Sequence, residues 1–147
     1  MINSIEDFKK FISDKSFKKI FVLCGKKSFV TSGAKENIEK IIINKEIKFF
    51  YKNFDLPILE ELIELIKDIK NFKPDLILAV GGGTVMDYAK IANVVDVRPD
   101  LSELIKNYSY PFKEKYTKLA VIPTTAGSGA EVTSNAVIYV DGIKHSF

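Results

Sequence analysis

The stretch that decides the fold is residues 76–90, LILAVGGGTVMDYAK. Its first five residues form a short apolar run, which is typical of a strand buried on both faces of a parallel sheet. Residues 81–83 (GGG) interrupt this run, and the segment from Thr84 to about Val95 is predicted to be helical. A strand, a glycine turn and a helix in this order predict one strand-to-helix unit of an α/β protein.

Segments of the same two kinds alternate along the rest of the chain. Four further strand-like runs are predicted: residues 19–24 (KIFVLC), 47–51 (IKFFY), 119–122 (LAVI) and 136–140 (AVIYV), the last followed by a turn signal at Asp141 and Gly142. Amphipathic helices are predicted from Ser4 as the cap to Ile12, over residues 32–43, and from Pro57 to Ile69. Alternation of this kind implies right-handed crossovers. The predicted fold class is therefore α/β, a Rossmann-like parallel sheet flanked by helices, in one domain spanning residues 1–147.

The composition is that of one cored domain. The chain has 147 residues, of which 46% are hydrophobic and 28% charged. The net charge is +3, but the basic residues are spread lysines with Arg98 as the sole arginine, so we predict no nucleic-acid partner. Cys24 is the sole cysteine and is expected to be a small buried hydrophobic residue. No run of eighteen apolar residues and no signal peptide is recognisable, which predicts a soluble cytoplasmic protein without a membrane partner.

The glycine turn is the first candidate site. In open α/β sheets, ligands bind beyond the carboxyl ends of the strands. Glycines permit positive φ and the close approach of an anion, Thr84 offers a hydroxyl and a helix cap, and the helix N-terminus is electropositive. The same residues would also suit a turn with no ligand, in which Asp87 only complements the helix dipole. Neither GxGxxG after the first strand nor a P-loop is present, so the glycines alone leave both interpretations open.

A second segment narrows the choice. Residues 123–133 (PTTAGSGAEVT) follow the fourth predicted strand, about forty residues after the glycine turn. Together with residues 81–90 (GGGTVMDYAK), this segment resembles the paired motifs of the iron-containing alcohol dehydrogenase family, in the family's order and spacing. The resemblance extends from the KIFVLC strand to Lys144. It implies a dehydroquinate synthase-like N-terminal domain that binds NAD or NADP.

The resemblance also implies which residues bind the cofactor: Gly82, Gly83, Thr84, Asp87, Thr124, Thr125, Ser128 and Lys144. In the family, the glycine turn holds the pyrophosphate and the aspartate supports that turn. The paired threonines bind from the opposite side, with the serine nearby, and the lysine reaches the cofactor near its ribose. Taken as bare residues, the threonines would equally cap their own turn, and Lys144 would be a solvated charge. Lys90, three residues after the aspartate, would make only a surface ion pair.

The chain departs from the family pattern at the end of the second predicted strand. Members that prefer NAD often carry an acidic residue there, whereas this chain has Tyr51 and Lys52, with Asp55 three positions beyond the lysine. Leu56 replaces the family's asparagine before the loop proline. The choice between NAD and NADP therefore stays open.

The family's metal site has no counterpart in this sequence. Members hold a divalent metal, usually iron and sometimes zinc, with one aspartate and three histidines in a helical C-terminal domain. This chain has one histidine, His145, which we expect to be exposed. We therefore predict no catalytic and no metal-binding residue here, and an isolated chain that is inactive.

Three functions remain as alternatives. The first is the cofactor-binding domain of a metal-dependent alcohol dehydrogenase, whose partners are a dinucleotide and a small alcohol or aldehyde. The second is a nucleotide-binding or interaction module without catalysis. The third is a domain of a related superfamily member, such as glycerol dehydrogenase, maleylacetate or phosphonoacetaldehyde reductase, or dehydroquinate synthase. Apolar surface is expected near the motif-bearing strand ends, which would favour a homo-oligomer.

Overall fold

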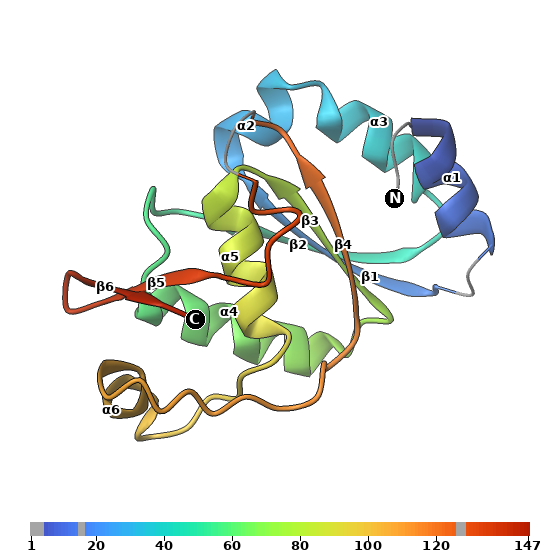
Figure 1. The fold of residues 1–147 in the computed structure, drawn as a ribbon. Helices are drawn as coiled ribbons and strands as arrows, with labels where there is room; N and C mark the ends of the chain where they lie inside the picture. Colours follow the sequence, from blue (N-terminus) through green and yellow to red (C-terminus); the bar gives the residue numbers. More distant parts are fainter. Residues whose placement is uncertain (1–4, 15–16, 126–128) are drawn as a thin grey trace.

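A computed structural model describes residues 5–14, 17–125 and 129–147. Its centre is a parallel sheet with the strand order β2-β1-β3-β4 (Figure 1). The four strands are β1 (Lys19–Gly25), β2 (Glu46–Lys52), β3 (Leu76–Gly81) and β4 (Lys118–Pro123). All four predicted counterparts lie within these bounds. Because every pairing is parallel, the carboxyl ends of the four strands share one edge of the sheet.

Helices cover both faces of the sheet. They are α1 (Ile5–Asp14), α2 (Lys26–Thr31), α3 (Ala34–Ile41), α4 (Leu59–Phe72), α5 (Gly83–Ala92) and α6 (Leu101–Lys106). Figure 1 shows α1, α2 and α3 on one face and α4 and α5 on the other. The three helices predicted before the glycine turn correspond to α1, α3 and α4. The helix predicted after that turn corresponds to α5, which ends at Ala92 rather than near Val95. The predicted cap Ser4 lies outside the described residues.

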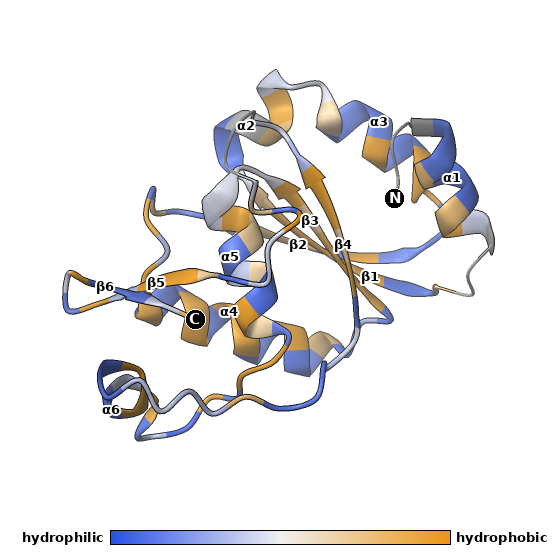
Figure 2. Cartoon of the chain, viewed as in Figure 1, coloured by the Kyte–Doolittle hydropathy of each residue, from blue (hydrophilic) through white to orange (hydrophobic). Residues whose placement is uncertain are grey.

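The central strands explain why the sheet is buried on both faces. In β1, Phe21 and Leu23 join the core on the α4–α5 side, while Ile20 and Val22 join the core on the α1–α3 side. This alternation follows from the two-residue period of a strand. Figure 2 shows the strands as mainly apolar and the helices as apolar toward the sheet and polar outward. A continuous apolar run in the sequence is therefore needed to fill both layers.

The predicted fifth strand does not join the parallel sheet, which corrects the sequence interpretation. Strand β5 (Val137–Val140) pairs antiparallel with β6 (Ile143–Ser146) in a separate hairpin. Asp141 and Gly142 form its turn, both with positive φ, which matches the right-handed twist of a hairpin and confirms the turn signal. No helix occurs in the described part of the segment between β4 and β5, and a parallel neighbour needs such a crossover. The hairpin instead packs against α4 and α5 (Figure 1).

Two short helices were not predicted. Helix α2 buries Phe29 in the α1–α3 core, and α6 buries Leu101 and Ile105 in the other core. One or two buried side chains give too weak a period to mark a helix in the sequence. The predicted helix over residues 32–43 is shorter, because Gly33 has a φ of 72° and α3 begins after it.

Candidate functional site

The two sequence motifs meet at the carboxyl edge of the sheet. Strands β3 and β4 are neighbours, with Gly81 paired to Pro123. The N–H of Thr124 donates to the carbonyl oxygen of Gly81 over 2.9 Å. A Cβ atom placed on Gly82 would lie 3.0 Å from Oγ1 of Thr125. The glycine turn after β3 and the threonine turn after β4 are thus in direct contact.

The glycines are required for space rather than for positive φ. Gly82 has φ −86° and ψ −170°, which any residue can adopt, and the described positive-φ glycines lie elsewhere in the chain. The positive φ that these glycines would permit is therefore not used in this turn. A Cβ on Gly81 would approach Cγ2 of Val85 to 2.6 Å, which is closer than real contacts allow. The turn needs glycine because it passes so close to the first turn of α5 and to the threonine turn.

The N-terminus of α5 opens onto this contact. Gly82 is the N-cap and Gly83 the first helical residue, and no described side chain caps the helix. The first N–H groups of a helix have no carbonyl partner within it and carry a partial positive charge. The cap predicted for Thr84 is wrong, because its hydroxyl donates to the carbonyl oxygen of Asp55 over 2.9 Å. That bond ties the loop after β2 to the same helix.

Thr124 carries a buried hydroxyl with no protein partner among the described residues. A buried hydroxyl without a hydrogen bond costs about 1–3 kcal/mol. Thr124 lies at the carboxyl end of β4, where the glycine turn contacts the threonine turn. A polar ligand atom at this place would form the missing hydrogen bond with its hydroxyl. Thr125 is exposed beside it. The remaining predicted residue of this turn, Ser128, lies outside the described residues.

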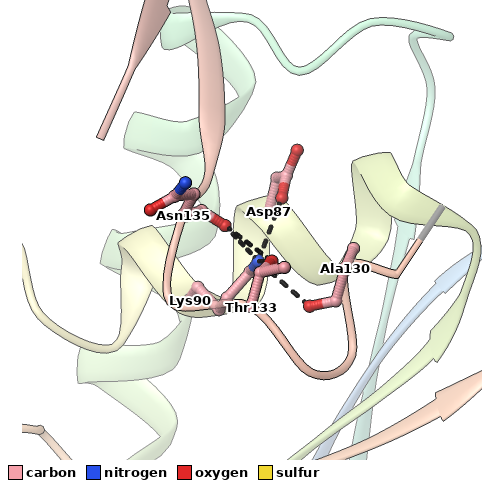
Figure 3. Close-up of polar contacts among 5 residues, drawn as sticks. All are labelled: Asp87, Lys90, Ala130, Thr133 and Asn135. Carbon is pink, nitrogen blue, oxygen red and sulfur yellow. Dashed lines mark hydrogen bonds and ion pairs between the residues drawn. The ribbon is translucent and has the colours of Figure 1, made fainter.

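Asp87 supports the segment that follows β4. Its carboxylate lies 3.3 Å from Nζ of Lys90 (Figure 3). It also accepts the backbone N–H of Val137 at the start of β5. Burial raises the pKa of Asp87 above its usual range, although these two groups and the charge of Lys144 oppose the shift. The structure thus connects Asp87 to the hairpin strand rather than to the glycine turn itself. Lys144 is exposed on β6, and its described interaction is this electrostatic one.

Lys90 does far more than form a surface ion pair, so that interpretation is wrong. Its side chain is only 17% exposed. Besides facing Asp87, its ammonium donates to the carbonyl oxygens of Ala130, over 3.1 Å, and of Asn135 (Figure 3). The hydroxyl of Thr133 lies 3.5 Å away. The signal in the sequence was an aspartate and a lysine three residues apart, but the loop acceptors lie 40 to 45 residues away and could not be predicted from it.

A buried hydrogen-bond network holds the loop after β2, and no pattern in the sequence predicted it. The hydroxyl of Tyr88 on α5 donates to Glu61 on α4 over 2.8 Å and accepts the N–H of Ile58 over 2.8 Å. The other carboxylate oxygen of Glu61 accepts the N–H of Asn53. Burial raises the pKa of Tyr88, which keeps its proton for this bond. Glu61 is buried, which is uncommon for a carboxylate unless it is hydrogen-bonded as here.

Two further residues were predicted from the sequence. Cys24 is buried as expected, and burial raises the pKa of its thiol to about 12, so it remains a protonated hydrophobic residue. His145 was expected to be exposed, and this is wrong. It is 4% exposed, and neither ring nitrogen has a hydrogen-bond partner among the described residues. Its ring lies 5.8 Å from that of Tyr108, because β6 turns this side chain toward the core.

The described residues contain neither a membrane-spanning helix nor a cluster of metal ligands. None of their helices is long and apolar enough to cross a bilayer. Within the same residues, no three side chains of His, Cys, Asp or Glu gather in an arrangement that could hold a metal ion.

The fold and the paired turns define the class of protein. It is a parallel α/β domain with a polar site at the carboxyl edge of its sheet. The sequence profile described as "Iron-containing alcohol dehydrogenase" matches residues 2–147. The chain belongs to the iron-containing alcohol dehydrogenase family, as the paired motifs indicated.

Individual relatives agree with this assignment. The 4-hydroxybutyrate dehydrogenase of Clostridium kluyveri is 34% identical over 141 residues, which cover 89% of this chain and 35% of that protein. An aldehyde-alcohol dehydrogenase of Streptococcus pneumoniae is 40% identical over 80 residues, covering 48% of this chain and 9% of that protein. The chain therefore spans a third or less of the length of most curated relatives that it matches.

Solved structures show the same fold. An iron-containing alcohol dehydrogenase of Thermococcus thioreducens has a TM-score of 0.79 and 26% identity, over 99% of this chain and 40% of that one. A sulfoacetaldehyde reductase of Bifidobacterium kashiwanohense, solved in complex with NAD+, has a TM-score of 0.81 and 22% identity, over 97% of this chain and 38% of that one. The second similarity shows the fold alone.

Proposed function

We propose that this chain is the cofactor-binding domain of an NAD(P)-dependent alcohol dehydrogenase, in which the contact between the glycine and threonine turns holds a dinucleotide. The observation that carries the proposal is the meeting of three features at one place. These are a glycine turn without side chains, the open N-terminus of α5, and the buried hydroxyl of Thr124, which has no hydrogen-bond partner in the part of the chain that the structure describes. Together they fit a ligand with a diphosphate and further polar atoms.

Each residue has a distinct part in this proposal. The N–H groups of Gly82, Gly83 and Thr84 would receive the pyrophosphate, because they lie at the positive end of α5. The absence of a Cβ at Gly82 keeps the phosphate site open toward the other turn. Thr124 and Thr125 would donate their hydroxyls from the opposite side. Thr84 contributes its N–H and not its hydroxyl, because the hydroxyl is already bonded to Asp55.

Asp87, Ser128 and Lys144 would contribute to the site in different ways. Asp87 contacts Lys90 and Val137, so it would support the site indirectly, without touching the cofactor. Lys144 would add positive charge near the ribose. Ser128, outside the described residues, is kept on the resemblance alone. A bound nicotinamide cofactor would accept or deliver the hydride, and this chain would hold it in place.

The names of the relatives indicate the substrate class. They include alcohol, aldehyde-alcohol and 4-hydroxybutyrate dehydrogenases, so we propose a small alcohol or aldehyde as the substrate of the whole enzyme. The family name implies iron, but the described residues do not assemble a set of metal ligands. We therefore derive no step through a metal and assign these residues to the cofactor alone. The chain by itself is expected to be inactive.

Titration with NADH and NADPH tests the proposal. At least one of them should bind, as measured by calorimetry or by cofactor fluorescence. Gly82→Val should abolish binding, because its side chain would press into the threonine turn. Gly83→Val should do the same by blocking the helix N-terminus. Gly142→Asn is the matched control, since that glycine lies in the β5–β6 turn and asparagine tolerates positive φ.

The outcomes of the titration are clear-cut. Retained affinity in both valine variants would place the cofactor elsewhere. No binding of either dinucleotide by the parent chain at millimolar concentration would overturn the proposal. Circular dichroism of each variant checks that the loss of binding is not a loss of fold.

A further inference from the structure

Helix α5 contacts the segment after β4 at two places along its length. At its N-terminus, Gly82 lies against Thr125. Two turns further on, Lys90 reaches the loop of residues 129–135, which continues the same motif-bearing segment (Figure 3). One rigid helix therefore touches both the start and the later part of this segment. The position of the loop relative to the glycine turn depends on the second contact.

The ammonium of Lys90 is surrounded by oxygen atoms. The carboxylate of Asp87 lies on the helix side, and the oxygens of Ala130, Thr133 and Asn135 lie on the loop side. A lysine ammonium has three N–H donors, so these groups account for its whole hydrogen-bonding capacity. Asp87 in turn accepts the N–H of Val137, just beyond the loop. The Asp87–Lys90 pair on α5 thus holds the loop through the loop's own backbone groups.

The described loop is largely exposed to solvent. The side chains of residues 131–135 are exposed, and Val132 is 71% exposed. A turn closes between Gly129 and Val132, and the loop becomes buried again only at Ala136, which exchanges two backbone hydrogen bonds with Phe147. Few apolar contacts and exposed backbone are the marks of a segment that opens locally. The polar contacts to Lys90 therefore restrain a segment that is otherwise largely exposed.

We propose that Lys90 is a positioning residue, which holds the loop of residues 129–135 against α5 in the arrangement that allows the site to receive the dinucleotide. This inference rests on the proposed function, because it assigns a cause to the affinity of that same site. Lys90 does not need to touch the cofactor. It acts by fixing the loop to the helix whose N-terminus binds the pyrophosphate, and Asp87 acts by holding Lys90 in place.

The expected effect is a change in population. If the loop is released and only about one tenth of the molecules keep the competent arrangement, the apparent Kd rises about tenfold. Lys90→Met keeps the length of the side chain and removes the three donors. Because that variant leaves the Asp87 carboxylate without its cation, stability will also change. The double variant Asp87→Asn/Lys90→Met removes both charges and separates the two effects.

The experiment measures hydrogen exchange and dinucleotide affinity in the same samples. In Lys90→Met, amides of residues 129–135 should exchange faster by a larger factor than amides of β1 and β3, whose exchange follows the overall stability, and NADH or NADPH should bind about tenfold more weakly. Saturating dinucleotide should restore protection of the loop. The double variant should regain stability but keep the fast-exchanging loop and the weak binding. Lys67→Met, which removes an exposed lysine of α4, is the control and should match the parent.

Each outcome bears on a different claim. Unchanged loop exchange in Lys90→Met would overturn the positioning role, whatever the affinity. A released loop with unchanged affinity would overturn it as well, because the loop would then not matter for binding. If the parent chain binds neither dinucleotide, the proposed function fails, and the cofactor part of this inference fails with it. The exchange data from the unliganded chain distinguish that case from the first.

Discussion

The two faces of the sheet are built in different ways. The face under α1, α2 and α3 is closed by apolar side chains such as Phe8, Ile12 and Phe29. The face under α4, α5 and the hairpin contains all three buried polar residues of the described chain, Glu61, Asn93 and His145. Buried polar groups cost stability unless they are bonded, and Glu61 and Asn93 are bonded to the backbone of neighbouring loops. The first face stabilises the fold, and the second also positions loops at the carboxyl edge.

Removing an aromatic ring from the apolar face should have the largest effect on stability. Phe29 is fully buried there, so Phe29→Ala should lower the free energy of unfolding by about 3–5 kcal/mol. Chemical denaturation measures this loss. The folded fraction should still bind dinucleotide with the parent Kd, because the loops of the other face are untouched. A change in Kd of tenfold or more would mean that the two faces are not independent.

On the second face, a single hydroxyl should have a smaller but localised effect. Tyr88→Phe leaves Glu61 and the N–H of Ile58 without their shared partner, which should cost about 1–3 kcal/mol. Hydrogen exchange should show the opening concentrated in the loop after β2, at residues 53–58. Uniform exchange changes over the whole domain would contradict a positioning role for this network.

The end of β2 offers a test of cofactor choice. Tyr51 and Lys52 stand where a carboxylate would repel a 2′-phosphate, and the Lys52 ammonium is bonded to the carbonyl of Phe54. We expect NADPH to bind at least as tightly as NADH. Lys52→Glu should weaken NADPH by about tenfold, or about 1.4 kcal/mol, with little effect on NADH. Lys40→Glu on α3 is the control for charge alone, and an equal loss there would refute a local contact.

The amino edge of the sheet should show the smallest effect. The carboxylate of Asp75 accepts the N–H groups of Lys18 and Lys19, and these bonds lower its pKa below the usual 3.8. A lowered pKa stabilises the fold above about pH 4, and this gain is lost as the pH falls through the folded-state value. Asp75→Ala should therefore cost about 1 kcal/mol at neutral pH, after discounting for solvent exposure. The difference from the parent should shrink in acid, and a difference independent of pH would contradict this account.

The sequence predicted those features that local pattern decides. The four sheet strands follow from continuous apolar runs, and the shared edge of the two motifs follows from parallel neighbours in one sheet. Pairing of β5 with β6 was missed, because strand partners depend on the loop between them and not on the strand itself. The interactions of Thr84, Tyr88 and Lys90 join residues 27 to 45 positions apart. The local periodicity of apolar residues cannot predict contacts between residues so far apart in the sequence.

The most direct test of the central claim is an amide chemical-shift titration of the chain with NADH and NADPH. The account predicts that one dinucleotide shifts the signals of Gly82, Gly83 and Thr84 after β3 and of Thr124 and Thr125 after β4 together, with one common Kd. Shifts at one turn without the other, or none at millimolar concentration, would show that the two turns do not grip a single molecule.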